Sequence, residues 1–323
     1  MKYTRLGRSG LTVSRLAFGC MSLGAEWGFD EDQSRQQVTA AFEAGVNFFD
    51  TADVYGRGNS ERILGSSLKD IAHREDYIIA SKVFMPVANG PNHSGLGRKH
   101  IISSIDNSLK NLGTDYLDIY QAHRFDPLTP IEESLEAFDE VVKAGKVRYI
   151  GASSMFAWQF MKMLGVSEKR SLTRFISMQN HYNLIYREEE REMIPLCLSE
   201  GVGVIPWSPL ARGRLARSEA TVRSGSDRLS KQWYPESQAQ TAIVETVRSI
   251  AKTRGIPPAQ LGLAWVLSKP AVSAPVIGVS KPHHLLDALG AIDVELTAEE
   301  IAALEAPYVP TAVVAIEEPW RVV

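Results

Sequence analysis

Cysteine is scarce in this chain, with only Cys20 and Cys197 among 323 residues. Two cysteines cannot build a disulfide framework, and this pair lacks the spacing of a metal site, so no metal is expected. We expect free, mostly buried thiols in a reducing compartment. No apolar run approaches the ~20 residues that a membrane span needs, and residues 1–7 lack the apolar stretch of a secretory signal. These absences predict a soluble, cytoplasmic protein.

Excess charge is also missing, because the formal net charge is only -3. Neither a nucleic acid nor an acidic membrane surface is therefore expected as a partner. The chain contains no Gly-x-Gly-x-x-Gly and no Gly-x-x-x-x-Gly-Lys-Ser/Thr motif, so neither a Rossmann domain nor a P-loop is indicated. No change in composition separates two domains. We expect a single domain over residues 1–323.

Short apolar runs recur roughly every 25–35 residues, and each is followed by an amphipathic stretch, as in parallel βα units. The expected strands are residues 16–19, 47–50, 77–82, 118–123, 147–153, 175–179, 202–207 and 274–277. Eight such strands close a barrel. The sequence therefore predicts the α/β class, as a single (β/α)₈ TIM barrel.

Helix signals fall between these runs. The expected helices are residues 32–44 with an N-cap at Asp32, 99–112 ending at Gly113, 130–144 opening with Pro130, and a short extra helix at 297–304 near the C-terminus. Thr297 and Glu300 form a capping-box pattern at that last helix. Residues 85–98 and 211–235 are predicted to be long loops at the C-terminal mouth of the barrel, where long loops tend to be functional.

Several expected strands end in a polar or aromatic residue after an apolar run. These residues are Asp50, Lys82, His123, Ser153, Gln179 and Trp207. Any one of them could simply form a turn. Together they would converge on the C-terminal mouth, where barrels of this kind build their active sites.

Asp50, Tyr55, Lys82 and His123 form a coherent acid–base set. A lysine ammonium beside a phenol favours the phenolate and lowers the tyrosine pKa, and a buried lysine needs a carboxylate partner such as Asp50. His123 could donate a hydrogen bond to a substrate carbonyl. A lysine at a barrel strand end can also form a Schiff base, but the neighbouring aspartate and tyrosine favour carbonyl reduction.

At these residues the sequence resembles the aldo-keto reductase superfamily. The resemblance rests on GVNFFDTADVYG at 45–56, SKV at 81–83 and QAHR at 121–124. The stretches SMQNHYNL at 177–184 and PWSPLARG at 206–213 are most similar to the bacterial, potassium-channel-β-like branch. The resemblance runs almost from end to end.

The resemblance implies roles for individual residues. Tyr55 would be the general acid, tuned by Lys82 and Asp50, and His123 would orient the carbonyl. Ser153 and Gln179 would hold the nicotinamide amide, whose ring would stack on Trp207. The family usually has Asn at the position of Ser154. Serine is a shorter donor, so its contact to the nicotinamide amide would be lost or mediated by water. Further cofactor contacts would come from Ser208, Pro209, Leu210, Arg212, Gly213, Arg228, Ile277, Gly278, Ser280, Lys281, His284 and Asp287.

Ser280 and Lys281 also have the chemistry of a phosphate site from the residues alone, because they precede a helix opened by Pro282. We therefore expect an NADPH-dependent oxidoreductase that reduces an aldehyde or ketone, with NADP(H) as cofactor and a small carbonyl compound as partner. A cofactor-binding regulatory subunit and a Schiff-base aldolase are the alternatives. The sequence leaves the physiological substrate and a homo-oligomer open. Among the remaining histidines, a structural hydrogen bond is expected for His181, and solvated side chains are expected for His73, His93, His100 and His283.

Overall fold

The computed structural model describes residues 1–25, 28–216, 232–279 and 281–316. One sheet of eight parallel strands has the order β10-β3-β4-β5-β6-β7-β8-β9. Its strands are β3 (Ala17–Gly19), β4 (Phe48–Asp50), β5 (Ile78–Val83), β6 (Leu117–Ala122), β7 (Val147–Ser153), β8 (Phe175–Gln179), β9 (Gly203–Val204) and β10 (Val276–Gly278). All of the expected strands are present, and the predicted (β/α)₈ barrel is confirmed.

The two edges of the sheet meet through backbone hydrogen bonds. Val204 in β9 donates to the Ala271 carbonyl at 3.0 Å, and its own carbonyl accepts from Ser273 at 2.8 Å. Val276 in β10 donates to the Pro206 carbonyl at 2.8 Å. These bonds satisfy edge groups that would otherwise be unpaired.

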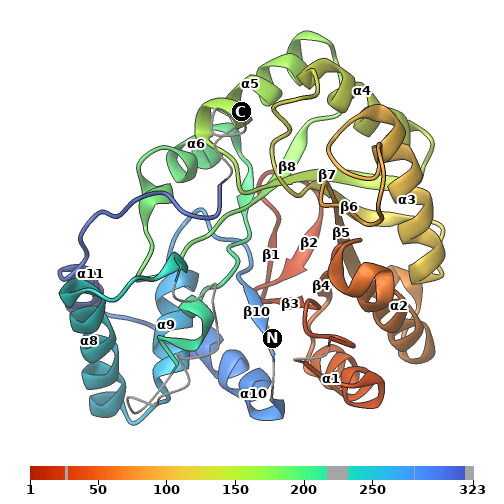
Figure 1. Ribbon diagram of the computed structural model, residues 1–323. Helices are drawn as coiled ribbons and strands as arrows, with labels where there is room; N and C mark the ends of the chain where they lie inside the picture. Colours follow the sequence, from red (N-terminus) through yellow and green to blue (C-terminus); the bar gives the residue numbers. More distant parts are fainter. Residues whose placement is uncertain (26–27, 217–231, 280, 317–323) are drawn as a thin grey trace.

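Helices lie around the outside of the strands (Figure 1). They are α1 (Glu31–Glu43), α2 (Asn59–Ile71), α3 (Arg98–Leu112), α4 (Ile131–Lys143), α5 (Ala157–Lys169), α6 (Met193–Glu200), α8 (Gln238–Arg254), α9 (Pro258–Leu267), α10 (Pro282–Gly290) and α11 (Ala298–Glu305), with 3-10 turns η1 (Tyr55–Gly58), η2 (Arg74–Asp76), η3 (Glu188–Glu190), η4 (Ala211–Gly213) and η6 (Ala291–Asp293). The main apolar core fills the space between this ring and the sheet. No helix within the described part of the chain is long and apolar enough to span a membrane.

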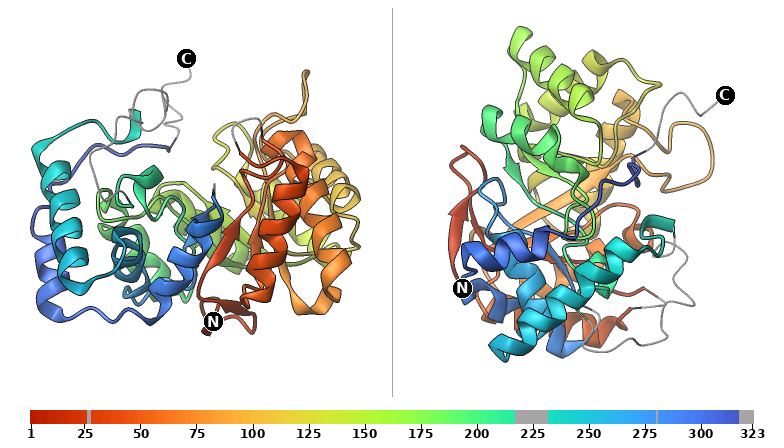
Figure 2. Two further views of the ribbon diagram at one scale, coloured as in Figure 1. Left: turned by 90° about the horizontal axis from the view of Figure 1, so that it is seen from below. Right: turned by 90° about the vertical axis from the view of Figure 1, so that its left-hand side faces the viewer.

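A β-hairpin of β1 (Tyr3–Arg5) and β2 (Thr12–Ser14) was not foreseen, although its two short runs and the intervening glycines carry a hairpin signal. Leu6 and Val13 pack into the second apolar cluster together with residues from inside the barrel. The Asn47 side chain, directly before β4, accepts from the Ser14 backbone and donates to the Thr12 carbonyl. The hairpin therefore covers the N-terminal end of the barrel, and Figure 2 shows it from two sides.

Helix ends agree with the sequence in part. Gly113 ends α3 with a left-handed φ of 65°, and Thr297 and Glu300 cap α11, as expected. The N-cap of α1 is Asp30, whose side chain accepts from the Gln33 backbone, so the assignment to Asp32 was wrong. Pro130 is the N-cap of α4 and stands outside the helix, because its extended ψ of 132° is not helical.

Candidate active site

Lys82 is completely buried, and its ammonium is held by oxygen atoms of Asp50, the last residue of β4, and of Thr51 directly after it. Its Nζ lies 2.7 Å from Oδ2 of Asp50 and 2.8 Å from the Thr51 carbonyl. Burial lowers the pKa of Lys82, but the neighbouring Asp50 and Tyr55 outweigh that effect and leave the pKa above its ordinary value. The side chain therefore carries its positive charge at neutral pH.

The second oxygen of Asp50 is held by two amides. Nε2 of Gln179 donates to Oδ1 at 2.8 Å, and Nε2 of Gln121 donates to the same atom at 3.0 Å. Gln121 was not singled out in the sequence, yet it pairs with Lys82 in the β5–β6 register. It also precedes His123 by two residues, and this spacing puts both side chains on one face of a strand. That alternation was the available signal.

Tyr55 stands in η1, directly after the loop that leaves β4. Gly56 and Arg57 have left-handed φ values of 57° and 53°, and the turn that they form directs the chain away from β4. Nζ of Lys82 lies 5.1 Å from the centre of the Tyr55 ring. Burial raises the pKa of Tyr55, and the opposing effect of Lys82 does not overcome it, so the net pKa is above the ordinary value. The lysine thus limits a rise rather than producing a net fall.

His123 follows β6, and its ring meets the Tyr55 ring edge-on, with centres 6.1 Å apart. Burial lowers the pKa of His123 far below its ordinary value, and the charges of Lys82 and Arg124 lower it further. The ring is therefore neutral at pH 7, with one nitrogen as donor and one as acceptor. The structure brings together the four residues that the sequence grouped as an acid–base set.

Trp207 is half-buried and lies beside the C-terminal ends of β7 and β8. Its Nε1 donates to Oγ of Ser154 at 3.0 Å, and the His181 ring stacks on it at 4.2 Å with an interplanar angle of 9°. Oγ of Ser153 donates to the Gln179 carbonyl at 2.9 Å. Four residues predicted to surround a nicotinamide are thus connected. The structural hydrogen bond expected for His181 is confirmed, to Tyr234.

The segment after Trp207 winds tightly. Ser208, Arg212 and Gly213 have φ values of 51°, 53° and 86°, while Pro209 is buried and Leu210 half-buried. The Arg212 guanidinium lies 5.7 Å from the centre of the Trp233 ring. Backbone turned in this way can point successive N–H groups toward an anion.

The other cofactor residues lie around the start of α10. Ile277 is buried, Gly278 and Lys281 are exposed, and His284 and Asp287 are half-buried. Lys281 is the N-cap of α10, so its side chain and the helix N-terminus suit a phosphate group. Burial and the charges of His283 and Lys281 lower the pKa of His284. Arg228 and Ser280 lie outside the described residues.

His100 was expected to be solvated, and that expectation was wrong. Its side chain is 3% exposed, and Nδ1 lies 2.9 Å from the Gly95 carbonyl in the loop before α3. His73, His93 and His283 are exposed, as expected.

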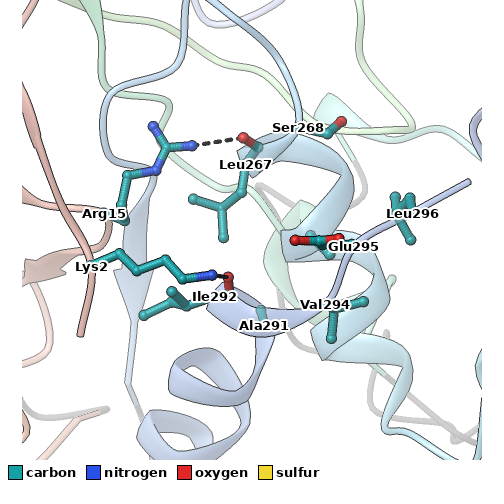
Figure 3. A pocket seen from close by; sticks show the side chains of 10 residues that line it. Lys2, Arg15, Leu267, Ser268, Ala291, Ile292, Val294, Glu295 and Leu296 are labelled. Atoms are coloured by element: carbon teal, nitrogen blue, oxygen red, sulfur yellow. Dashed lines mark hydrogen bonds between the residues drawn. The ribbon is translucent and has the colours of Figure 1, made fainter.

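A separate pocket of about 460 Å³ lies away from these residues, between the hairpin, α9 and η6. Figure 3 shows Arg15 donating to the Leu267 carbonyl and Lys2 donating to the Ile292 carbonyl along its wall. Arg15 precedes β3, so this pocket is at the N-terminal end of the barrel. The catalytic candidates stand at the opposite, C-terminal ends of the strands.

Comparison with known proteins agrees with this geometry. The sequence model of the aldo/keto reductase family matches residues 15–308. The chain belongs to this family. It is 42% identical to versiconal hemiacetal acetate reductase of Aspergillus parasiticus, over 97% of this chain and 98% of that protein. It is also 42% identical to aldo-keto reductase AFTS1 of Alternaria alternata, over 95% of this chain and 91% of that protein.

Relatives from the yeasts Schizosaccharomyces pombe and Saccharomyces cerevisiae carry aryl-alcohol dehydrogenase in their names, at 42% and 39% identity, and this chain covers 97% and 98% of their lengths. These relatives are fungal proteins named after reduction or dehydrogenation. The family membership of this aldo/keto reductase is therefore confirmed. Its placement in the potassium-channel-β-like branch finds no support in these names and stays a prediction.

Proposed function

We propose that this aldo/keto reductase uses NADPH to reduce an aldehyde or ketone to an alcohol. The observation that carries the proposal is the cluster at the C-terminal ends of β4, β5 and β6. It places a charged lysine, a carboxylate, a phenol and a neutral imidazole beside one another. The lysine supplies a fixed positive charge beside the phenol, and this charge favours the phenolate form of Tyr55.

The polar groups near Trp207 and α10 suit a nicotinamide dinucleotide. Trp207 would face the nicotinamide ring, and Ser153 and Gln179 would hold its amide. Lys281 and His284 would bind the 2′-phosphate. The bound cofactor supplies a hydride for the carbonyl carbon. Nicotinamide cofactors are typical of this family, and the preference for NADPH is part of the proposal.

The protein's own residues handle the proton. The neutral His123 ring can donate one N–H to the carbonyl oxygen and polarise it. The Tyr55 hydroxyl gives its proton to the developing alkoxide, and Lys82 stabilises the phenolate that remains. Asp50 keeps Lys82 charged and in place, while Gln121 and Gln179 hold Asp50.

Turnover of a simple aromatic aldehyde by NADPH tests the proposal. Aromatic aldehydes are chosen because of the names of the yeast relatives. In addition, Phe125, two residues after His123, packs against Trp158 at the start of α5, with ring centres 6.2 Å apart. We expect aldehyde-dependent NADPH oxidation and a stoichiometric alcohol. Borohydride trapping of a Lys82 adduct, without NADPH oxidation, would instead support the aldolase.

The two buried free thiols, Cys20 and Cys197, fit the cytoplasmic location that belongs to this proposal.

A further inference from the structure

Three aromatic rings form a continuous stack beside the site. His181 lies between Tyr186, at 4.3 Å and 12°, and Trp207, at 4.2 Å and 9°. The Trp233 ring meets Trp207 edge-on at 5.3 Å. One face of Trp207 is therefore covered by a buried ring, although Trp207 itself is half-buried.

His181 is built into this stack as a neutral ring. It is 3% exposed, and burial lowers its pKa to about 3. Its Nε2 lies 2.5 Å from the hydroxyl of Tyr234, and Nδ2 of Asn183 donates to the same hydroxyl at 3.1 Å. Asn183 also donates to the Ser208 carbonyl at 2.9 Å. The plane of the imidazole is thus fixed from its edge as well as from both faces.

Ser154 fixes the edge of Trp207. Its Oγ accepts from the indole Nε1 at 3.0 Å and lies 3.2 Å from Oγ of Ser153. Ser154 has a φ of 45°, a left-handed conformation that serine rarely adopts. Backbone strain of this kind persists only where the surroundings enforce it. The resemblance predicted that a direct contact of Ser154 to the nicotinamide amide would be lost or mediated by water, and in this structure its hydroxyl accepts a hydrogen bond from Trp207.

We propose that Ser154 and His181 are positioning residues for the cofactor ring and act through Trp207. The inference rests on the proposed function, in which Trp207 faces the nicotinamide. A tryptophan that is half-exposed could turn about its side-chain bonds, and ordering it on binding would cost affinity. The stack and the indole hydrogen bond remove that freedom beforehand. Ser154 thus supports the platform for the ring.

Dissociation constants for NADPH test this inference in Ser154→Ala and His181→Ala, each made in the natural chain and in a Trp207→Leu background. In the natural chain, each change should weaken NADPH binding by about three- to tenfold, the size of one aromatic contact. In the Trp207→Leu background the same changes should have almost no further effect, because their route to the cofactor is gone. Equal losses in both backgrounds would overturn the inference.

Two further variants separate positioning from general packing. His181→Phe keeps a ring in the stack and should restore most of the NADPH affinity lost in His181→Ala. Tyr182→Phe removes a neighbouring buried hydroxyl that bonds to Glu190 instead, and it should leave NADPH binding unchanged. A loss in Tyr182→Phe as large as in His181→Ala would show a non-specific effect and refute the inference. If Trp207→Leu alone leaves NADPH affinity intact, the platform in the proposed function fails, and this inference fails with it.

Discussion

At the scale of single residues, Asp50 organises the site. It accepts hydrogen bonds from Lys82, Gln121 and Gln179 with its two oxygens. A buried lysine without a carboxylate would lose its proton, and a buried carboxylate without donors would be equally costly. The charge pair is therefore stable as a unit, and Tyr55 and His123 are placed around it.

Replacing Tyr55 with phenylalanine should lower the rate of carbonyl reduction by about 10²–10⁴-fold, because general acid catalysis typically contributes that much. NADPH affinity should remain nearly unchanged, since the phenol is not an anchor for the cofactor. Single-turnover rates and NADPH titrations with a slow substrate check both expectations. A variant that keeps most of its turnover would remove Tyr55 from the role of proton donor.

Lys82→Met should move the pH dependence of alcohol oxidation to higher pH. Burial already raises the pKa of Tyr55, and Lys82 is the largest effect that lowers it. Oxidation needs the phenolate, so its rate rises with pH up to that pKa. Stopped-flow rates of hydride transfer, recorded at a series of pH values, measure the shift. Lys110→Met, at an exposed position of α3, is the control. An identical profile in the two variants would argue against the coupling.

At the scale of elements, the N-terminus of α10 is the candidate site for the 2′-phosphate. Lys281→Ala should weaken NADPH binding by very roughly tenfold or more, because a charge-assisted hydrogen bond contributes about 1.5–3 kcal/mol. NADH, which lacks the phosphate, should be almost unaffected. Dissociation constants for both cofactors decide the point, and equal losses would move the phosphate elsewhere.

The same titrations at several pH values examine His284. Its pKa is lowered in the free protein. The ring therefore becomes positively charged only at a pH below the ordinary histidine pKa of about 6.5. A bound phosphate would favour the charged ring, and the preference for NADPH should therefore increase as the pH falls from 8 to 6. Titration of the phosphate itself near pH 6 reduces the size of this trend.

The first turn of α1 offers a test of helix capping. Asp30→Ala should lower the free energy of unfolding by about 1 kcal/mol, since it removes the side-chain acceptor for the Gln33 backbone. Asp32→Ala, two residues later and exposed, should cost distinctly less. Urea unfolding of the two variants makes the comparison. Equal losses would mean that charge near the helix N-terminus matters and the cap does not.

At the scale of the whole molecule, the barrel buries a pair of carboxyl groups behind the site. Burial and the nearby Glu61 raise the pKa of Asp53 to about 8. Glu61 accepts hydrogen bonds from Ser81 and Asn111. The folded protein therefore keeps a proton on Asp53 that the unfolded chain releases near its ordinary pKa of about 4.

The contribution of Asp53 to stability should consequently fall as the pH rises between about 4 and 8, because at this group the folded state binds more protons than the unfolded state over that range. Asp53→Asn removes this penalty, so its unfolding free energy relative to the natural chain should increase with pH across the window. Urea unfolding at pH 5 and pH 8 measures the change, with exposed Asp115→Asn as control. A difference between Asp53→Asn and the natural chain that does not vary with pH would contradict the raised pKa.

The sequence by itself determined the barrel, the family resemblance and the grouping of Asp50, Tyr55, Lys82 and His123. Apolar runs that alternate with amphipathic stretches identify the strands locally. Parallel strands of a barrel must bring their C-terminal ends to one mouth. Only the tertiary structure decided the net direction of the Tyr55 pKa, the burial of His100 and the partner of Ser154. Each depends on which distant groups share a small, poorly hydrated space, such as Trp207 beside Ser154. Because these contacts join residues far apart in the chain, no local pattern encodes them.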